Sequence, residues 1–405
     1  MKKFLALLLS AVMVFALVAC GGGGGTTEPA TPAAPATTTP ATPATPAEPA
    51  TPATPATPAA PAAADMKVAM ITDYGDITDQ SFNQTTYEAA KSWSESNGVD
   101  FTYFKPASDS DDDRVAMIEK AIDEGYTVIV MPGYAFGPAI VATAPEYSDV
   151  TFIALDVSAG DLGDGFQMPA NLYCAVYQEE LCGYMAGYAA VKLGYSKLGF
   201  LGGMAVPAVV RYGYGFVQGA DAAAAADGKT DVSIKYAYGN QFYGDGDITA
   251  AMDTWYAAGT EVVFACGGGI FTSAGEAAAK VGGKVIGVDV DQAPTIDGLY
   301  GANMTVTSAM KGLAATVNTL LTQVKDGSFA GGKVDTLGLV SANPEENYVQ
   351  IPLGSTQWSD SFSKDDYKAL VGDMFGGKVT VSNDITKAAG DFATVTTVED
   401  LGNIK

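Results

Sequence analysis

The stretch KVAMITDYGDITDQSFNQTTYEAAKSW, residues 67–93, decides how this chain folds. Residues 67–71 form a short apolar run that predicts a strand. The loop that follows is rich in aspartate and glycine, and residues 81–95 then carry apolar side chains at helical spacing. We expect a helix there, capped by Ser81. A strand, a polar loop and a helix in this order are the repeating unit of an α/β fold.

The same unit recurs along the chain as two successive sets of similar length. Two sets in about 340 residues indicate a two-lobed α/β protein with parallel sheets. Ligands of such sheets bind beyond the carboxyl ends of the strands, so the loops there are expected to line a cleft. Further strands are predicted at 100–104, 127–131, 151–155, 172–177, 197–201, 232–238, 261–265 and 284–288, and helices at 112–124, 138–144, 180–193, 214–226, 248–258 and 273–281.

The first twenty residues have the pattern of a secretion signal. Two lysines precede an apolar run at 4–18, shorter than the roughly 20 residues of a membrane-spanning helix. Small residues lead into Cys20 as in a bacterial lipobox, which predicts cleavage before Cys20 and diacylation of its sulfur. The alternative is an ordinary signal peptide with a chance cysteine. Residues 21–65, five glycines and then Ala-Thr-Pro near-repeats, predict a disordered tether, and 66–405 the folded domain.

Composition excludes several classes of function. The formal net charge of −24 argues against binding nucleic acid or an anionic membrane surface. The chain has no histidine, which removes the commonest general base and most transition-metal sites, and we expect no cofactor and no metal. Beyond Cys20 the cysteines are Cys174, Cys182 and Cys266, which read as small buried residues, with a Cys174–Cys182 bridge as the alternative.

The loop after the first strand holds the strongest candidate site. Asp73 follows the strand directly, and Phe82 and Asn83 would lie in the exposed first turn of the helix. A large aromatic ring at a helix start that faces a cleft can stack on a flat ligand ring. The alternative is a capping segment whose phenylalanine fills the core, and the residues alone favour neither.

Five segments occur in an order that resembles one known family. They are ITDYGDITDQSFNQTTYEA (71–89), TFIALD (151–156), GYMAGYAAVKLGYSKLGFLGGMAVPAVVRYGYGFVQGA (183–220), VIGVDVDQ (285–292) and TSAMKG (307–312). The chain resembles the basic membrane protein family, the PnrA-like nucleoside-binding lipoproteins of ABC importers. The resemblance implies a type I periplasmic-binding-protein fold, with two Rossmann-like lobes joined by a three-crossover hinge. It places about 66–177 with 305–335 in lobe 1 and about 178–304 in lobe 2, and divides the C-terminus between them.

The resemblance also implies which residues hold the ligand. Asp73 and Asn83 match positions that bond the nucleobase, Phe82 matches the stacking aromatic, and Asp156 matches a second polar base contact. Asp289 and Lys311 match the pair that holds the ribose hydroxyls. The sequence departs from the family pattern after PAVV, where Arg211-Tyr212 stands in place of a phenylalanine. Tyr212 is therefore the second aromatic we expect, with Phe242 as the alternative.

The function that the resemblance implies is binding without chemistry. A lipid-anchored monomer on the extracytoplasmic face of the cell membrane would capture a nucleoside, purine preferred, and deliver it to an ABC permease and its ATPase. One alternative is the same fold binding a sugar or another small polar solute, such as riboflavin or a signalling compound. Others are a ligand-sensing surface receptor without transport and a nucleoside hydrolase, which the absence of histidine disfavours.

Overall fold

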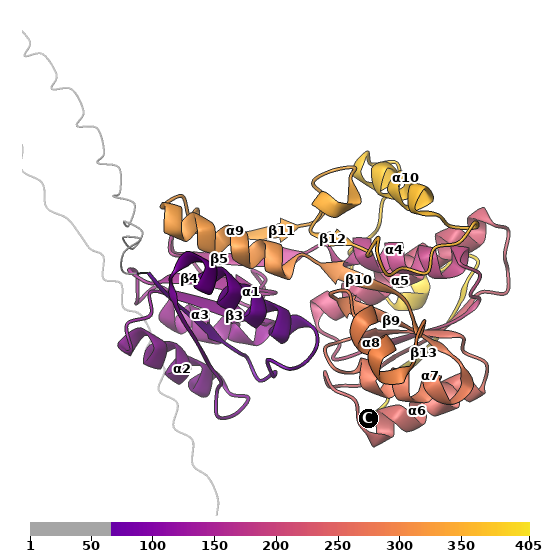
Figure 1. The fold of residues 1–405 in the computed structure, drawn as a ribbon, viewed down its shortest axis with the longest axis horizontal. Helices are drawn as coiled ribbons and strands as arrows, with labels where there is room; N and C mark the ends of the chain where they lie inside the picture. Colours follow the sequence, from indigo (N-terminus) through magenta and orange to yellow (C-terminus); the bar gives the residue numbers. More distant parts are fainter. Residues whose placement is uncertain (1–65) are drawn as a thin grey trace, which may run out of the picture. The chain divides into compact units, whose positions relative to one another are not determined.

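The computed structural model describes residues 66–405, and they contain two parallel sheets (Figure 1). The expected signal sequence, lipidated Cys20 and tether lie outside the described residues. Within 66–405, no helix is long and apolar enough to cross a membrane. The remaining cysteines, Cys174, Cys182 and Cys266, are free and buried.

The first sheet has six strands in the order β11-β5-β4-β3-β1-β2, and every pairing in it is parallel. The three central strands are buried along almost their whole length, because helices cover both faces. Its elements are β1 (Lys67–Ile71), α1 (Phe82–Asn97), β2 (Asp100–Phe104), α2 (Asp111–Asp123), β3 (Val128–Pro132), η2 (Tyr134–Phe136), α3 (Gly137–Thr143), β4 (Thr151–Leu155), β5 (Leu172–Tyr177), α9 (Leu313–Asp326) and β11 (Lys333–Leu337).

The second sheet has seven strands in the order β12-β10-β9-β8-β6-β7-β13. Only the short β12 runs antiparallel to its neighbour. Its elements are α4 (Glu179–Lys192), β6 (Lys197–Gly202), α5 (Pro207–Ala226), β7 (Ser233–Tyr238), α6 (Gly246–Ala257), β8 (Val262–Cys266), α7 (Phe271–Val281), β9 (Lys284–Asp289), α8 (Ala293–Tyr300), β10 (Thr305–Lys311), η3 (Pro344–Glu346), β12 (Val349–Gln350), α10 (Lys364–Phe375), η4 (Ala389–Phe392) and β13 (Thr397–Asn403).

The two sheets repeat one topology. In each, the first strand lies between the second and the third, so β1 separates β2 from β3 and β6 separates β7 from β8. The chain passes between the sheets three times, after β5, after β10 and after β11. The expected α/β fold with parallel-sheet lobes is confirmed.

The predicted lobe boundaries need one correction. The resemblance places residues 305–335 in the first lobe, but β10 pairs with β9 in the second sheet, and only α9 and β11 return to the first. The register with β9, in which Met310 lies opposite Asp289, decides this placement. The strand's membership is set by long-range pairing, which its own apolar pattern does not specify.

Glycines let helices α4 and α5 approach each other backbone to backbone. A Cβ at Gly183 would lie 2.2 Å from the Tyr212 carbonyl oxygen, and one at Gly215 would lie 2.1 Å from the Glu180 oxygen. These contacts align the helices in parallel, so their amino ends meet. The glycine spacing that marks residues 183–219 is therefore a packing requirement.

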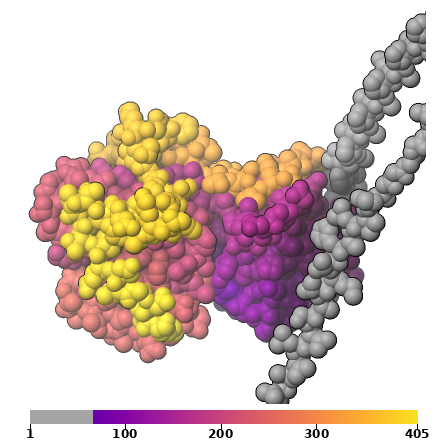
Figure 2. All heavy atoms as spheres, turned by 180° about the vertical axis from the view of Figure 1, so that it is seen from behind, coloured from indigo at the N-terminus to yellow at the C-terminus, as the bar shows by residue number. Residues whose placement is uncertain are grey.

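The end of the chain extends the second sheet. Figure 2 shows this segment, in yellow, lying across the second half of the domain. Strand β13 pairs in parallel with β7, which would otherwise be an open edge. Asp221 on α5 anchors the segment, since its carboxylate accepts hydrogen bonds from the backbone amides of Thr394, Val395 and Thr396.

Candidate functional site

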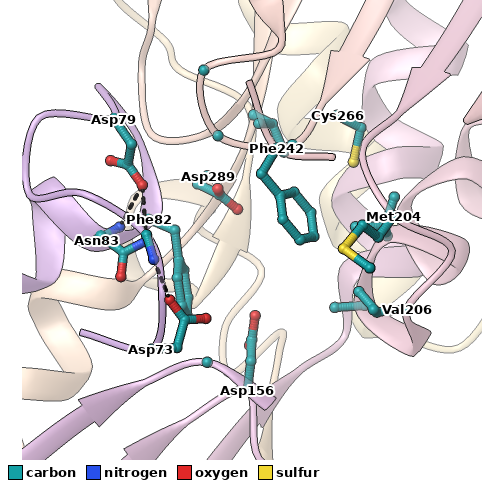
Figure 3. Close-up of a pocket in the computed structure, with 18 of the residues that line it drawn as sticks. Asp73, Asp79, Phe82, Asn83, Asp156, Met204, Val206, Phe242, Cys266 and Asp289 are labelled. Atoms are coloured by element: carbon teal, nitrogen blue, oxygen red, sulfur yellow. Dashed lines mark hydrogen bonds between the residues drawn. The ribbon is translucent and has the colours of Figure 1, made fainter. Parts of the chain in front are cut away.

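A cavity of ≈ 720 Å³ lies where the carboxyl ends of the two sheets face each other. Loops after β1, β3 and β4 form one wall, and loops after β6, β7, β8 and β9 form the other. All seven ligand-binding residues expected from the sequence line this cavity: Asp73, Phe82, Asn83, Asp156, Tyr212, Asp289 and Lys311. Figure 3 shows several of them pointing into it.

Asp79, rather than Ser81, caps helix α1. Its carboxylate accepts hydrogen bonds from the backbone amides of Asn83 and Gln84, at 2.9 and 3.0 Å. Ser81 makes no capping bond and instead donates to Asp289 Oδ2 at 2.7 Å. The predicted cap was wrong because an aspartate two residues earlier reaches the same amides. Ser81 is thereby free to join the two walls of the cavity.

Asp73 presents one carboxylate oxygen to the cavity. Its Oδ1 accepts hydrogen bonds from the Tyr74 and Gly75 amides at 2.6 and 2.8 Å. Glycine at position 133 leaves room for the other oxygen: a Cβ there would lie 2.4 Å from Oδ2, and the φ of +125 also favours glycine. Burial raises the pKa of Asp73 above its usual value, although the two amides oppose this. The group is suited to pair with a ligand N–H.

Asn83 adds a second acceptor on the same wall. Its Nδ2 donates to Asp79 Oδ2 at 3.1 Å, which fixes the orientation of the amide. Its Oδ1 is buried and has no partner among the described residues. A buried acceptor without a partner costs about 1–3 kcal/mol, which a ligand donor would recover.

Asp156 and Asp289 occupy equivalent places in the two sheets. Asp156 follows β4 and Asp289 ends β9, and both adopt the left-handed conformation, with φ of 59 and 65. That conformation is uncommon for residues other than glycine and turns each side chain toward the cleft. Figure 3 shows the two carboxylates on different sides of the cavity.

Lys311 joins these carboxylates at the end of β10. Its Nζ lies 2.5 Å from Asp156, 3.6 Å from Asp289 and 3.7 Å from Glu179. Burial alone would lower the pKa of Lys311, but the three carboxylates raise it above its usual value. Lys311 therefore stays protonated, with acceptors supplied from both sheets.

Two phenylalanine rings face the cavity from its two walls. Phe82 lies at the start of α1, and Lys311 Nζ sits 4.7 Å from its ring centroid. Phe242, after β7, points inward from the other wall (Figure 3). Glycines make room for it, since a Cβ at Gly203 would lie 2.5 Å from its ring. Phe242 is thus the ring opposed to Phe82.

Tyr212 lines the cavity but is almost completely buried. It is only 2% exposed, and its hydroxyl donates to Asp289 Oδ1 at 3.3 Å. Its ring packs edge-on against the buried Phe264 of β8. Tyr212 can orient the Asp289 carboxylate, whereas the face of the Phe242 ring is accessible to a ligand in the cavity.

The comparisons with known proteins agree with this architecture. The family model described as "ABC transporter substrate-binding protein PnrA-like" matches residues 66–371. The chain belongs to this PnrA-like family. Its relatives include a Lactococcus lactis protein named "ABC transporter nucleoside-binding protein BmpA", 29% identical over 78% of this chain and 89% of that protein. Basic membrane protein A of Borreliella afzelii is 26% identical over 67% and 80%.

Solved structures show the same fold. A solute-binding protein of an ABC transporter system from Aeropyrum pernix K1 superposes with a TM-score of 0.60 at 20% identity, over 81% of this chain and 90% of that one. Another from Conexibacter woesei DSM 14684 gives 0.60 at 23% identity, over 78% and 99%. At these identities the likeness establishes the fold alone.

Three charged residues of this PnrA-like protein form a buried cluster that the sequence did not predict. Glu179 and Glu180 open α4 and are 0% and 3% exposed, and Arg211 lies in the second turn of α5. The Arg211 Nε donates to Glu179 Oε2 at 2.7 Å. The pair is separated by 32 residues and meets only because the glycines of α4 and α5 bring the amino ends of the helices together.

Glu180 makes the stability of the protein depend on pH. Burial raises its pKa from 4.5 to about 7. Between these values the folded state holds a proton that the unfolded state has lost, so this group reduces stability as pH rises. The Glu180→Gln variant lacks this titration. The native protein therefore loses stability across this range while the variant does not. We expect the free energy of unfolding of Glu180→Gln minus that of the native protein to increase by at least about 1 kcal/mol between pH 4.5 and 7.

Chemical denaturation at several pH values measures this difference. Glu124→Gln, at an exposed glutamate, is the matched control and should track the native protein throughout. A constant offset between Glu180→Gln and native across the range would contradict the prediction.

Proposed function

We propose that the protein captures a nucleoside, with purine preferred, in this cavity and delivers it unchanged to the permease of an ABC importer. Membership of a substrate-binding family supports the general role. The printed name of the Lactococcus lactis relative supports the ligand class. The geometry of the cavity supports the proposal independently.

One observation supports a nucleoside most directly. The ammonium of Lys311 lies 4.7 Å from the centroid of the Phe82 ring and 3.6 Å from the carboxylate of Asp289. A planar base can stack on Phe82, and the neighbouring acceptor and donor suit two adjacent hydroxyls of a ribose. Asp73 and Asn83 add acceptors for the polar edge of the base. An aromatic face beside a charged acceptor and donor suits a flat ring next to a vicinal diol, as in a nucleoside.

The interactions are strong enough for tight binding. One stacked base contributes about 1–3 kcal/mol, and each hydrogen bond to a charged group contributes about 1.5–3 kcal/mol. One stack with three or four such bonds gives micromolar affinity or better after the entropic cost of association is subtracted.

The ligand carried by the purified protein tests the proposal. We expect mass spectrometry of the full chain, solubilised in mild detergent, to find an intact nucleoside, and purine nucleosides to raise the unfolding temperature most within a panel. A sugar, riboflavin or another solute in its place would overturn the assignment. Steady release of free base from inosine would indicate a hydrolase instead.

We propose further that the protein is a monomer and that a lipid on Cys20 holds it on the extracytoplasmic face of the membrane. Two or more acyl chains give stable anchoring, whereas one is marginal. The Cys20→Ser variant is expected to move from the membrane fraction to the soluble fraction after cell disruption. Cys174→Ser is the control and should stay with the membrane. Retention of Cys20→Ser in the membrane fraction would argue against the anchor.

A further inference from the structure

Lys311 has one carboxylate neighbour that does not line the cavity. Glu179 is completely buried, and its Oε1 lies 3.7 Å from Lys311 Nζ without accepting a hydrogen bond from any described residue. Its Oε2 accepts the Arg211 Nε at 2.7 Å. The Glu179 carboxylate therefore lies between two cations, Lys311 and Arg211, and is itself shielded from the cavity.

The position of Glu179 follows from the chain path. Helix α4 begins where the chain leaves the first sheet after β5, and Lys311 ends β10 where the chain returns to it. Helix α4 packs against β10, so Glu179 and Lys311 belong to the same side of the cleft. Asp156 belongs to the first sheet, on the other side.

This difference separates the roles of the carboxylates around Lys311. If the lobes separate, Asp156 moves away from the ammonium. If a diol binds, its hydroxyls engage Asp289 and Lys311 directly. Glu179 is the neighbour that stays beside Lys311 in both situations, because nothing in the cavity can reach it.

We propose that Glu179 is a positioning residue, which holds the Lys311 ammonium in place to receive the ligand hydroxyls. The inference rests on the proposed nucleoside function. A lysine side chain loses rotamer freedom when it binds, and a fixed counter-charge removes part of that cost in advance.

Arg211 keeps Glu179 suited to this role. Burial raises the pKa of Glu179 above its usual value, and the nearby charges of Arg211 and Lys311 oppose this rise and favour the carboxylate. The short bond to Arg211 also fixes the side chain, leaving Oε1 directed at Lys311. The competing interpretation is a purely structural ion pair that holds α4 and α5 together.

Ligand truncation distinguishes the two interpretations. Native protein and Glu179→Gln are titrated calorimetrically with inosine and with 2′,3′-dideoxyinosine, which lacks both ribose hydroxyls. We expect Glu179→Gln to weaken inosine binding by about tenfold and to leave dideoxyinosine binding within about twofold of native. A structural role would weaken both ligands by the same factor.

Glu180→Gln is the matched control. Glu180 is the next residue, is equally buried and lies 3.9 Å from Arg211 Nε, but forms no ion pair with Lys311. It should bind inosine like the native protein. Glu179→Asp supplies a second test. It keeps a carboxylate opposite Arg211, so it should fold even if the neutral Glu179→Gln variant does not. We expect Glu179→Asp to weaken inosine binding but not dideoxyinosine binding, and by a smaller factor than Glu179→Gln does.

The outcomes separate this inference from the proposed function. Native affinity for inosine in both Glu179 variants, or an equal loss for the two ligands, would overturn the positioning role while nucleoside binding stands. Equal affinity of the native protein for inosine and its dideoxy analogue would do the same. A native protein that binds no nucleoside would remove both proposals.

Discussion

Asp289→Asn is expected to weaken inosine binding by about thirtyfold, or about 2 kcal/mol, without unfolding the protein. The carboxylate accepts from Ser81 at 2.7 Å and lies 3.6 Å from Lys311. An amide carries no charge and offers only one accepting oxygen. The variant therefore loses a charge-assisted acceptor for the ribose hydroxyls, and it also weakens the Ser81 contact that joins the two walls.

Asparagine is the informative replacement at this position. Asp289 has a φ of 65, a conformation that asparagine tolerates better than alanine does. Asp289→Asn thus changes the charge with little added backbone strain, so a loss of affinity reports on the site. Thermal unfolding followed by circular dichroism verifies the fold.

The matched control is Asp253→Asn on α6. Asp253 pairs with Lys280 at 2.9 Å on the surface, where the expected contribution of a salt bridge is small. Calorimetry should give native inosine affinity for this variant. If Asp289→Asn also bound like native, the diol would have to lie elsewhere in the cavity.

The sequence predicted the strands better than the helix ends. The strands at 151–155 and 172–177 have the expected bounds, because continuous apolar runs between polar loops are unambiguous in a buried parallel sheet. Helix α5 begins at Pro207, seven residues before the expected start at 214. Its first two turns line the cavity with residues that include Val209, Arg211 and Tyr212, so they do not carry the apolar stripe of a helix packed only on a core.

The position of three aspartates of the cavity was predictable because they follow strands, whereas their roles were implied by the family resemblance. Asp73, Asp156 and Asp289 each stand at or just after the end of a strand, and the carboxyl ends of parallel strands converge. The sequence named both Tyr212 and Phe242 as candidates for the second aromatic but could not decide which ring offers its face to the cavity. That choice depends on which ring fits above Gly203, a contact between loops far apart in the sequence.

Phe82→Ala is expected to weaken inosine binding by about thirty- to a hundredfold. Alanine substitution of a stacking aromatic costs about 1–3 kcal/mol per base, and loss of the contact with Lys311 at 4.7 Å adds to it. Phe82→Leu should recover part of the affinity, since it restores apolar area without an aromatic face. Phe101→Ala, on β2 against Tyr87, is the control outside the cavity and should bind normally.

The free base hypoxanthine separates the contribution of Phe82 from that of Asp289. Stacking involves the base alone, so Phe82→Ala should weaken hypoxanthine and inosine by similar factors in calorimetric titrations. Asp289→Asn removes a contact to the ribose and should weaken hypoxanthine far less than inosine, by no more than the loss of the Ser81 contact costs. This crossed pattern requires that the base lie on Phe82 while the sugar lies at Asp289. Were Phe82→Ala to weaken only inosine, the ring would be contacting the sugar, and the orientation of the ligand in the cavity would have to be reversed.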